Sequence, residues 1–250
     1  MTTKISKEDF KIKLIEFIAS HNNNLLDALR KKLEDDINCS GDYSTKPGKP
    51  NLDNIKSTGE TAFQRAIFNG EYSILNYGKE IGNKKVVWND FELPVTLNTK
   101  SRRISIDLIG LINNKPVLCE LKYHGKSQSK DQPIYAIVEL LMYYYFIQCN
   151  YKKLDKYNVH HDLLLKDFKW EIIVENSTSQ LLVVANKKYW DYWFKKTSKK
   201  ELLKQTLALS VDLNTNIHLF ETQDEDYIKQ KGIQETYKPT ASSNIWTKIE

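Results

Sequence analysis

The stretch DLIGLINNKPVLCELK, residues 107–122, decides the fold that the sequence predicts. Its two short runs of apolar and β-branched residues are typical of strands, and the polar NNKP between them is typical of a turn. A hairpin is therefore expected here. This hairpin would carry three charged side chains, Asp107, Glu120 and Lys122, within an otherwise apolar sheet.

The turn sets the relative position of these charges. If residues 113 and 114 form a two-residue turn, Asp107 lies directly across from Glu120. If the loop is instead residues 113–116, Asp107 lies across from Lys122. Side chains alternate along a strand, so the three charges share one face in both registers. The other residues of the second strand divide into core positions, Val117, Cys119 and Leu121, and positions on the acidic face, Leu118 and His124.

The surrounding sequence predicts an α/β fold in which helices flank a central mixed β-sheet. The patterns indicate helices over residues 7–20, 24–37, 57–68, 131–149 and 199–211, and further strands over 86–97, 169–176, 180–186 and 216–222. A loop rich in Gly, Pro, Ser and Asp separates the second helix from the rest. Residues 1–50 are therefore expected to form N-terminal helices and a linker, and residues 51–250 one main domain.

Composition limits the class of protein. The chain has 250 residues, 40% of them hydrophobic, and a net charge of +5, which favours a globular protein and a polyanionic partner without deciding either function. Three cysteines without a CxxC pair indicate neither a disulfide framework nor a zinc site, and a reducing cytoplasm is expected. The most apolar segment, IYAIVELLMYYYFI, is short and contains Glu139, so no membrane span is expected.

The three charges suggest a reaction. Two carboxylates side by side in a sheet need a compensating cation. Mg²⁺ prefers oxygen ligands and commonly takes one or two protein carboxylates, so Asp107 and Glu120 are candidate ligands for Mg²⁺, with Mn²⁺ as the alternative. An ammonium group beside the ion, such as that of Lys122, can orient water and stabilise charge on a phosphoryl group. The set is suited to phosphodiester hydrolysis. The structural alternative is a cross-strand ion pair between Asp107 and Lys122, with Glu120 at a solvated edge of the sheet.

The arrangement resembles a known family. Asp107, twelve intervening residues and Glu120-Leu121-Lys122, on a hairpin between two helices, resemble the motif of the PD-(D/E)XK nucleases, which include many restriction endonucleases. This resemblance covers about residues 57–186. It implies a restriction-endonuclease-like core in a nuclease-like domain over residues 51–250, with Asp107 and Glu120 as metal ligands and Lys122 as the catalytic lysine. Glu60 resembles a further metal ligand of the family, and a capping box with Ser57 is the alternative for this residue.

Two features depart from the family pattern. Ser105 and Ile106 precede Asp107, so the proline and the second acid of the family name are absent. Some branches also carry a Gln and a Tyr four residues apart on the next helix, whereas Gln132 and Tyr135 are three apart.

Other residues are candidates for supporting roles. Gln132 and His124 could contact a phosphate or water, although a helix-start hydrogen bond and a surface position are the simpler readings. Contacts to the nucleic-acid backbone are expected from four cationic residues, Lys126, Lys130, Arg102 and Arg103. The aromatic residues of KKYWDYWFKKTSKK are expected to pack one helix against the sheet, with its lysines in solvent.

The resemblance implies a metal-dependent DNA endonuclease of restriction or defence type, with double-stranded DNA as the expected substrate. A non-cleaving binding module of the same fold and an RNA-directed nuclease are the alternatives. A homodimer is one option for the oligomeric state. A second match to the acid pattern, Asp155 with Asp167 and Lys169, has no strand around its first acid and is the weaker candidate.

Overall fold

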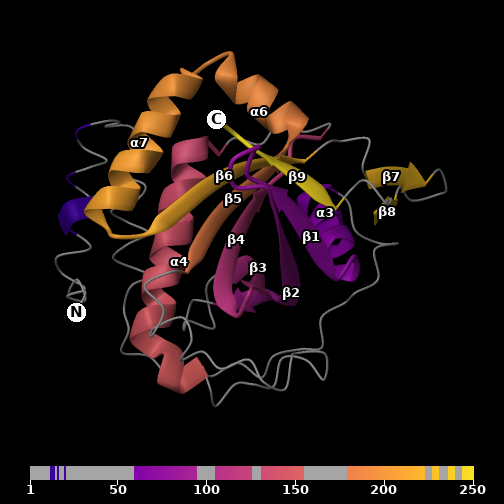
Figure 1. Ribbon diagram of the computed structural model, residues 1–250, viewed down its shortest axis with the longest axis horizontal. Coiled ribbons are helices and arrows are strands. Elements are labelled where there is room, and N and C mark those ends of the chain that lie inside the picture. The colour runs from indigo at the N-terminus through magenta and orange to yellow at the C-terminus, as the bar shows by residue number, and fades with distance from the viewer. Residues whose placement is uncertain are drawn as a thin grey trace.

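The fold comes from a computed structural model that describes residues 12–14, 16, 20, 59–94, 105–125, 131–154, 179–222, 227–230, 236–239 and 244–250. Figure 1 shows these elements in chain order. They are α3 (Gly59–Asn69), β1 (Tyr72–Asn76), β2 (Asn83–Pro94), β3 (Ser105–Ile112), β4 (Lys115–Lys122), α4 (Pro133–Leu154), β5 (Gln180–Asn186), α6 (Lys187–Phe194), α7 (Lys199–Asp212), β6 (Asn216–Thr222), β7 (Tyr227–Gln230), β8 (Thr236–Pro239) and β9 (Ile245–Lys248).

Seven strands form a closed mixed barrel in the order β1-β2-β3-β4-β5-β6-β9. The last strand closes it, because β9 pairs with β6 in the antiparallel sense and with β1 in the parallel sense. The predicted restriction-endonuclease-like core, a central sheet open at both edges and flanked by helices, is therefore wrong. The sequence analysis missed β1 and β9, which have five and four residues and are too short to show a clear periodicity.

The β3–β4 hairpin follows the first of the two predicted registers. Ile112 pairs with Lys115 and Leu108 with Cys119, so the turn has two residues. Asn113 and Asn114 occupy it with φ values of 48° and 63°, which is the left-handed backbone that a type I′ hairpin turn requires. The predicted strand over 86–97 corresponds to β2, which pairs antiparallel with β3, so β2, β3 and β4 form a three-strand meander.

Both faces of the barrel wall are covered along β3 to β6. One apolar cluster takes residues from all seven strands, among them Leu121 of β4 and Trp246 of β9, together with Phe63 and Ala66 of α3. The other cluster lies on the outer face of β3 to β6, where α4, α6 and α7 cover the sheet. The predicted alternation along β4 is confirmed. Val117, Cys119 and Leu121 belong to the first cluster and Leu118 to the second.

Several predicted elements are confirmed. The predicted helices over 57–68, 131–149 and 199–211 correspond to α3, α4 and α7, and the predicted strands over 86–97, 180–186 and 216–222 to β2, β5 and β6. The aromatic residues of α6 pack as expected, with Tyr189 and Trp190 fully buried. The segments 24–37 and 169–176 lie outside the described residues. Among the described helices, none is both long and apolar enough to cross a membrane.

Candidate active site

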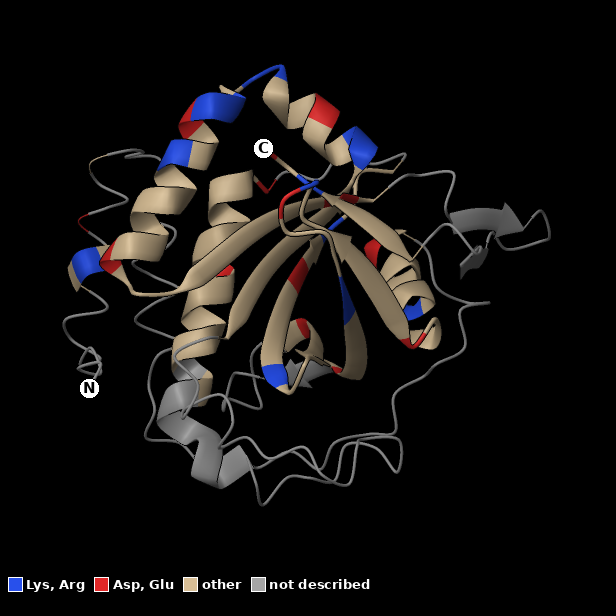
Figure 2. Cartoon of the chain, viewed as in Figure 1, with Lys and Arg blue, Asp and Glu red and all other residues tan. Residues whose placement is uncertain are grey.

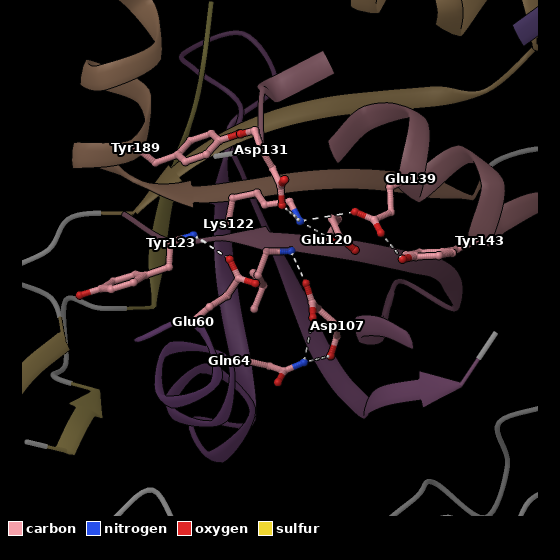
Figure 3. A network of polar contacts seen from close by, with 11 residues as sticks. Glu60, Gln64, Asp107, Glu120, Lys122, Tyr123, Asp131, Glu139, Tyr143 and Tyr189 are labelled. Atoms are coloured by element: carbon pink, nitrogen blue, oxygen red, sulfur yellow. Dashed lines mark hydrogen bonds and ion pairs between the residues drawn. The ribbon is translucent and has the colours of Figure 1, made fainter. Parts of the chain in front are cut away.

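The ammonium group of Lys122, at the end of β4, lies among three carboxylates (Figure 3). Its Nζ is 2.8 Å from Oε1 of Glu120, 3.5 Å from Oε2 of Glu139 on α4 and 3.8 Å from Oδ2 of Asp131. Lys122 and Glu120 are each 4% exposed. Both side chains are therefore buried, and Glu120 does not lie at a solvated sheet edge.

Asp107 is held by backbone and side-chain hydrogen bonds. Its Oδ2 accepts a bond of 2.7 Å from the backbone N–H of Leu121, on the strand opposite. Its Oδ1 accepts a bond of 3.1 Å from Nε2 of Gln64 on α3, which also donates to the Asp107 carbonyl at 2.9 Å. No ion pair within 4 Å joins Asp107 to Lys122 in the described part of the chain. The acid of β3 is therefore fixed against β4 independently of the lysine.

Glu60 links α3 to the same end of β4. It lies in the first turn of the helix, and its Oε2 accepts a bond of 3.1 Å from the backbone N–H of Tyr123. Ser57, its partner in the predicted capping box, lies outside the described residues. Figure 3 shows Glu60 on the side of β4 that also faces Asp107. Glu60 therefore lies beside the predicted site, but with Asp107 and Glu120 it does not form a group of three acids close enough to hold one metal ion within the described residues.

The electrostatics of the site show an excess of negative charge. Burial, and next the nearby Glu60, raise the pKa of Asp107 to about 8. Burial also raises the pKa of Glu120 well above its ordinary value, and Asp107 and Glu139 add to this effect. Burial alone would lower the pKa of Lys122, but the carboxylates of Glu120 and Glu139 outweigh it and the pKa is raised. Lys122 is therefore a stable cation among acids that its single charge does not fully compensate.

The carboxylates fit a hard divalent cation. Oε2 of Glu120 is buried and has no hydrogen-bond partner, which is costly for a carboxylate oxygen unless a cation binds it. In the described residues, no three His, Cys, Asp or Glu side chains are grouped closely enough to hold a metal ion alone. Two carboxylates with water and substrate phosphate are a normal set for Mg²⁺, whereas a closed zinc site needs more protein ligands. By their chemistry, the carboxylates of Asp107 and Glu120 are donors of the kind that Mg²⁺ or Mn²⁺ takes.

Of the predicted accessory residues, the structure describes His124 and Gln132. The ring of His124 packs against Tyr192, with ring centroids 5.0 Å apart, and within the described residues its side chain makes no hydrogen bond or ion pair to the acids. The backbone carbonyl of Gln132 accepts bonds from the N–H groups of Tyr135 and Ala136 at the start of α4. The four predicted cationic contacts, Lys126, Lys130, Arg102 and Arg103, lie outside the described residues, as do Asp155, Asp167 and Lys169.

Sequence reasoning missed four members of the site, which are Gln64, Asp131, Glu139 and Tyr143. Gln64 follows Glu60 by four residues and so shares its face of α3, which is a signal that the sequence does contain. Glu139 is an acid within an apolar segment, and Tyr143, one helical turn later, donates a bond of 2.5 Å from its hydroxyl to Oε1 of Glu139. A charged residue with a polar partner at this spacing on a buried helix predicts a buried polar contact.

Comparisons with protein-family models, curated proteins and solved structures give no match to the chain. The site must therefore be interpreted from its own residues.

Proposed function

We propose that the protein is a metal-dependent nuclease that hydrolyses phosphodiester bonds in double-stranded DNA. The observation that carries the proposal is the unpartnered, buried Oε2 of Glu120 beside the ammonium group of Lys122. The local resemblance of Asp107, Glu120 and Lys122 to the PD-(D/E)XK motif supports an endonuclease. The closed barrel gives no support of its own, so the proposal rests on these residues and their geometry.

The residues have distinct roles in this proposal. Asp107 and Glu120 would hold Mg²⁺, with Mn²⁺ as a substitute, and Glu60 is a candidate for an additional ligand. Such an ion supplies positive charge to phosphoryl oxygens and makes water more acidic. Lys122, a cation whose pKa is raised, stabilises the negative charge that grows on the phosphate during attack by water. Because it stays protonated, it does not act as the base that removes a proton from that water.

Neighbouring groups keep these roles in place. The N–H of Leu121 and the amide of Gln64 fix the carboxylate of Asp107, and Glu139 holds the lysine from the side of α4. Groups held by packing and hydrogen bonds need little reorganisation in the transition state, which is a major source of catalysis. The site thus combines charge for a phosphate with a rigid support on three elements.

The test is incubation of the protein with supercoiled plasmid, linear duplex, single-stranded DNA and RNA in Mg²⁺, Mn²⁺ or EDTA. We expect nicking or linearisation of the plasmid with either metal and none in EDTA. Cutting confined to RNA would favour the RNA-directed alternative. Binding to duplex without cutting of any substrate would favour the non-cleaving module.

A further inference from the structure

Four exposed lysines gather at the turn between α6 and α7. We call this group, Lys195, Lys196, Lys199 and Lys200, the lysine turn. Figure 2 shows its positive charge at the top of the molecule, between the two helices. Within the described residues, none of the four has a carboxylate within 4 Å, whereas the nearby Lys187 pairs with Asp191 at 2.7 Å. The positive charge of the turn is therefore not compensated by the described chain.

The position of two of these lysines is unfavourable for the fold itself. Lys199 and Lys200 occupy the first turn of α7, directly after its N-cap Ser198. A helix N-terminus carries partial positive charge, so cations there are repelled and anions are attracted. Glu201 is the acid of this first turn. A bound polyanion would relieve this repulsion. The two lysines are therefore better explained by binding of an anion than by a contribution to the stability of α7.

The lysine turn is connected to the candidate catalytic strand. Asn186 accepts a bond from the backbone N–H of His124 and donates one to its carbonyl, each 3.0 Å long. The same Asn186 side chain caps α6 by accepting from the N–H of Tyr189. These bonds fix the start of α6 to the chain two residues beyond Lys122.

The side chains of His124 and Tyr192 extend the contact between β4 and α6 as far as Lys196. The ring of His124 lies against Tyr192 of α6, and Nζ of Lys196 lies 3.9 Å from the centroid of the Tyr192 ring. A phosphate backbone that leaves the site past His124 would therefore meet Lys196 first and then the rest of the turn.

We infer that the lysine turn binds the phosphate backbone of the double-stranded DNA whose scissile bond lies at Lys122. This inference rests on the proposed function and assigns the path of its substrate. The α6 surface favours duplex over single strands, because single strands need exposed aromatic faces for stacking. Trp190 and Trp193 are buried, and the half-buried Tyr192 already contacts His124 and Lys196. The half-buried Phe194 stacks on Trp190. The exposed residues of α6 and the turn are therefore mostly charged, which suits contacts to a phosphate backbone.

The test measures duplex affinity by fluorescence anisotropy in EDTA, between about 50 and 200 mM salt. Two double variants, Lys199→Gln with Lys200→Gln and Lys195→Gln with Lys196→Gln, are compared with wild type. Each lysine that contacts a phosphate contributes about −0.9 to the slope of log affinity against log salt, so each pair should flatten the slope by about 1.8. The control pair, Lys85→Gln with Lys115→Gln, removes the same charge from exposed positions on β2 and β4 and should keep the wild-type slope.

The outcomes separate this inference from the proposed function. Wild-type slopes in both lysine-turn variants, or an equal flattening in the control pair, would overturn the inference even if the protein cuts DNA. Loss of affinity for RNA or single strands without loss for duplex would overturn it as well. Flattened duplex slopes in a protein that cuts nothing with Mg²⁺ would support the lysine turn and contradict the nuclease.

Discussion

The carboxylate of Asp107 accepts a 2.7 Å hydrogen bond from the backbone N–H of Leu121, so the acid of β3 is fixed to the strand that carries Glu120 and Lys122. The Asp107 side chain therefore has two roles in this account. One is structural, since it satisfies a backbone donor of β4. The other is the proposed metal ligation, which needs the negative charge.

Substitution of Asp107 should separate these two roles. Asp107→Asn keeps an acceptor for the Leu121 N–H but removes the charge, so we expect cleavage to fall by about a hundredfold or more with little change in stability. Asp107→Ala also leaves that N–H unpaired and should cost a further 1–3 kcal/mol or so of unfolding free energy, about the cost of an unsatisfied buried group. Urea unfolding and plasmid cleavage measure the two effects. Equal unfolding free energies of the two variants would show that the hydrogen bond does not contribute to stability.

Glu139 should act through Lys122. In Glu139→Gln the second carboxylate that holds the ammonium group is lost, and in Tyr143→Phe the hydroxyl that orients Glu139 is lost. Supporting residues of this kind typically contribute about 10- to 100-fold in activity, and we expect the loss in kcat more than in KM.

The neighbouring substitution Met142→Leu is the control for Glu139. Met142 is a buried residue of the same helix, and the substitution nearly conserves volume, so it should leave both constants close to wild type. A similar loss of kcat in Met142→Leu would assign the effect to packing of α4.

Closure of the barrel can be tested at β9. Trp246 is fully buried and its ring lies 5.5 Å from that of Trp88 on β2, whereas its neighbour Ile245 is 46% exposed. Trp246→Ala should lower the unfolding free energy by about 3–5 kcal/mol, as for other large core truncations. Ile245→Ala should change it by no more than about 0.5 kcal/mol. Equal, small effects in chemical unfolding would mean that β9 does not close the barrel.

The sequence predicted the hairpin more completely than the barrel. The two asparagines of the turn fix the register, and strand alternation then places Glu120 and Lys122 together, so local rules are enough for this part of the site. The position of Asp107 also depends on Gln64, on a helix distant in sequence. The spacing of Gln64 from Glu60 predicts a shared helix face but not the contact of that face with Asp107. The barrel depends on the pairing of β9 with β1, two short strands near opposite ends of the main domain. No periodicity in IWTK or YSILN indicates that pairing.

His218 should give the protein an acid-sensitive stability. Burial, and next Lys248 and Lys84, lower its pKa to about 4, while an unfolded histidine has a pKa near 6.5. The unfolded chain therefore binds the proton more tightly between these values, and stability should fall as pH decreases from about 6.5 to about 4. His218→Phe keeps a ring beside Tyr77 and does not titrate, so this variant should lose less unfolding free energy than wild type over the same pH range. Urea unfolding at several pH values checks this, and an equal loss in wild type and variant would contradict it.

The most direct test of the proposed function compares plasmid cleavage in Mg²⁺ by wild type, Glu120→Gln and Asp167→Asn. Glu120→Gln removes the charge of the carboxylate whose Oε2 has no partner, and its cleavage rate should fall by about a hundredfold or more while its melting shows an intact fold. Asp167→Asn, in the weaker pattern match, should cut within a few-fold of wild type. Cleavage by Glu120→Gln at the wild-type rate, or loss of cleavage in Asp167→Asn instead, would contradict the assignment of the active site to Asp107, Glu120 and Lys122.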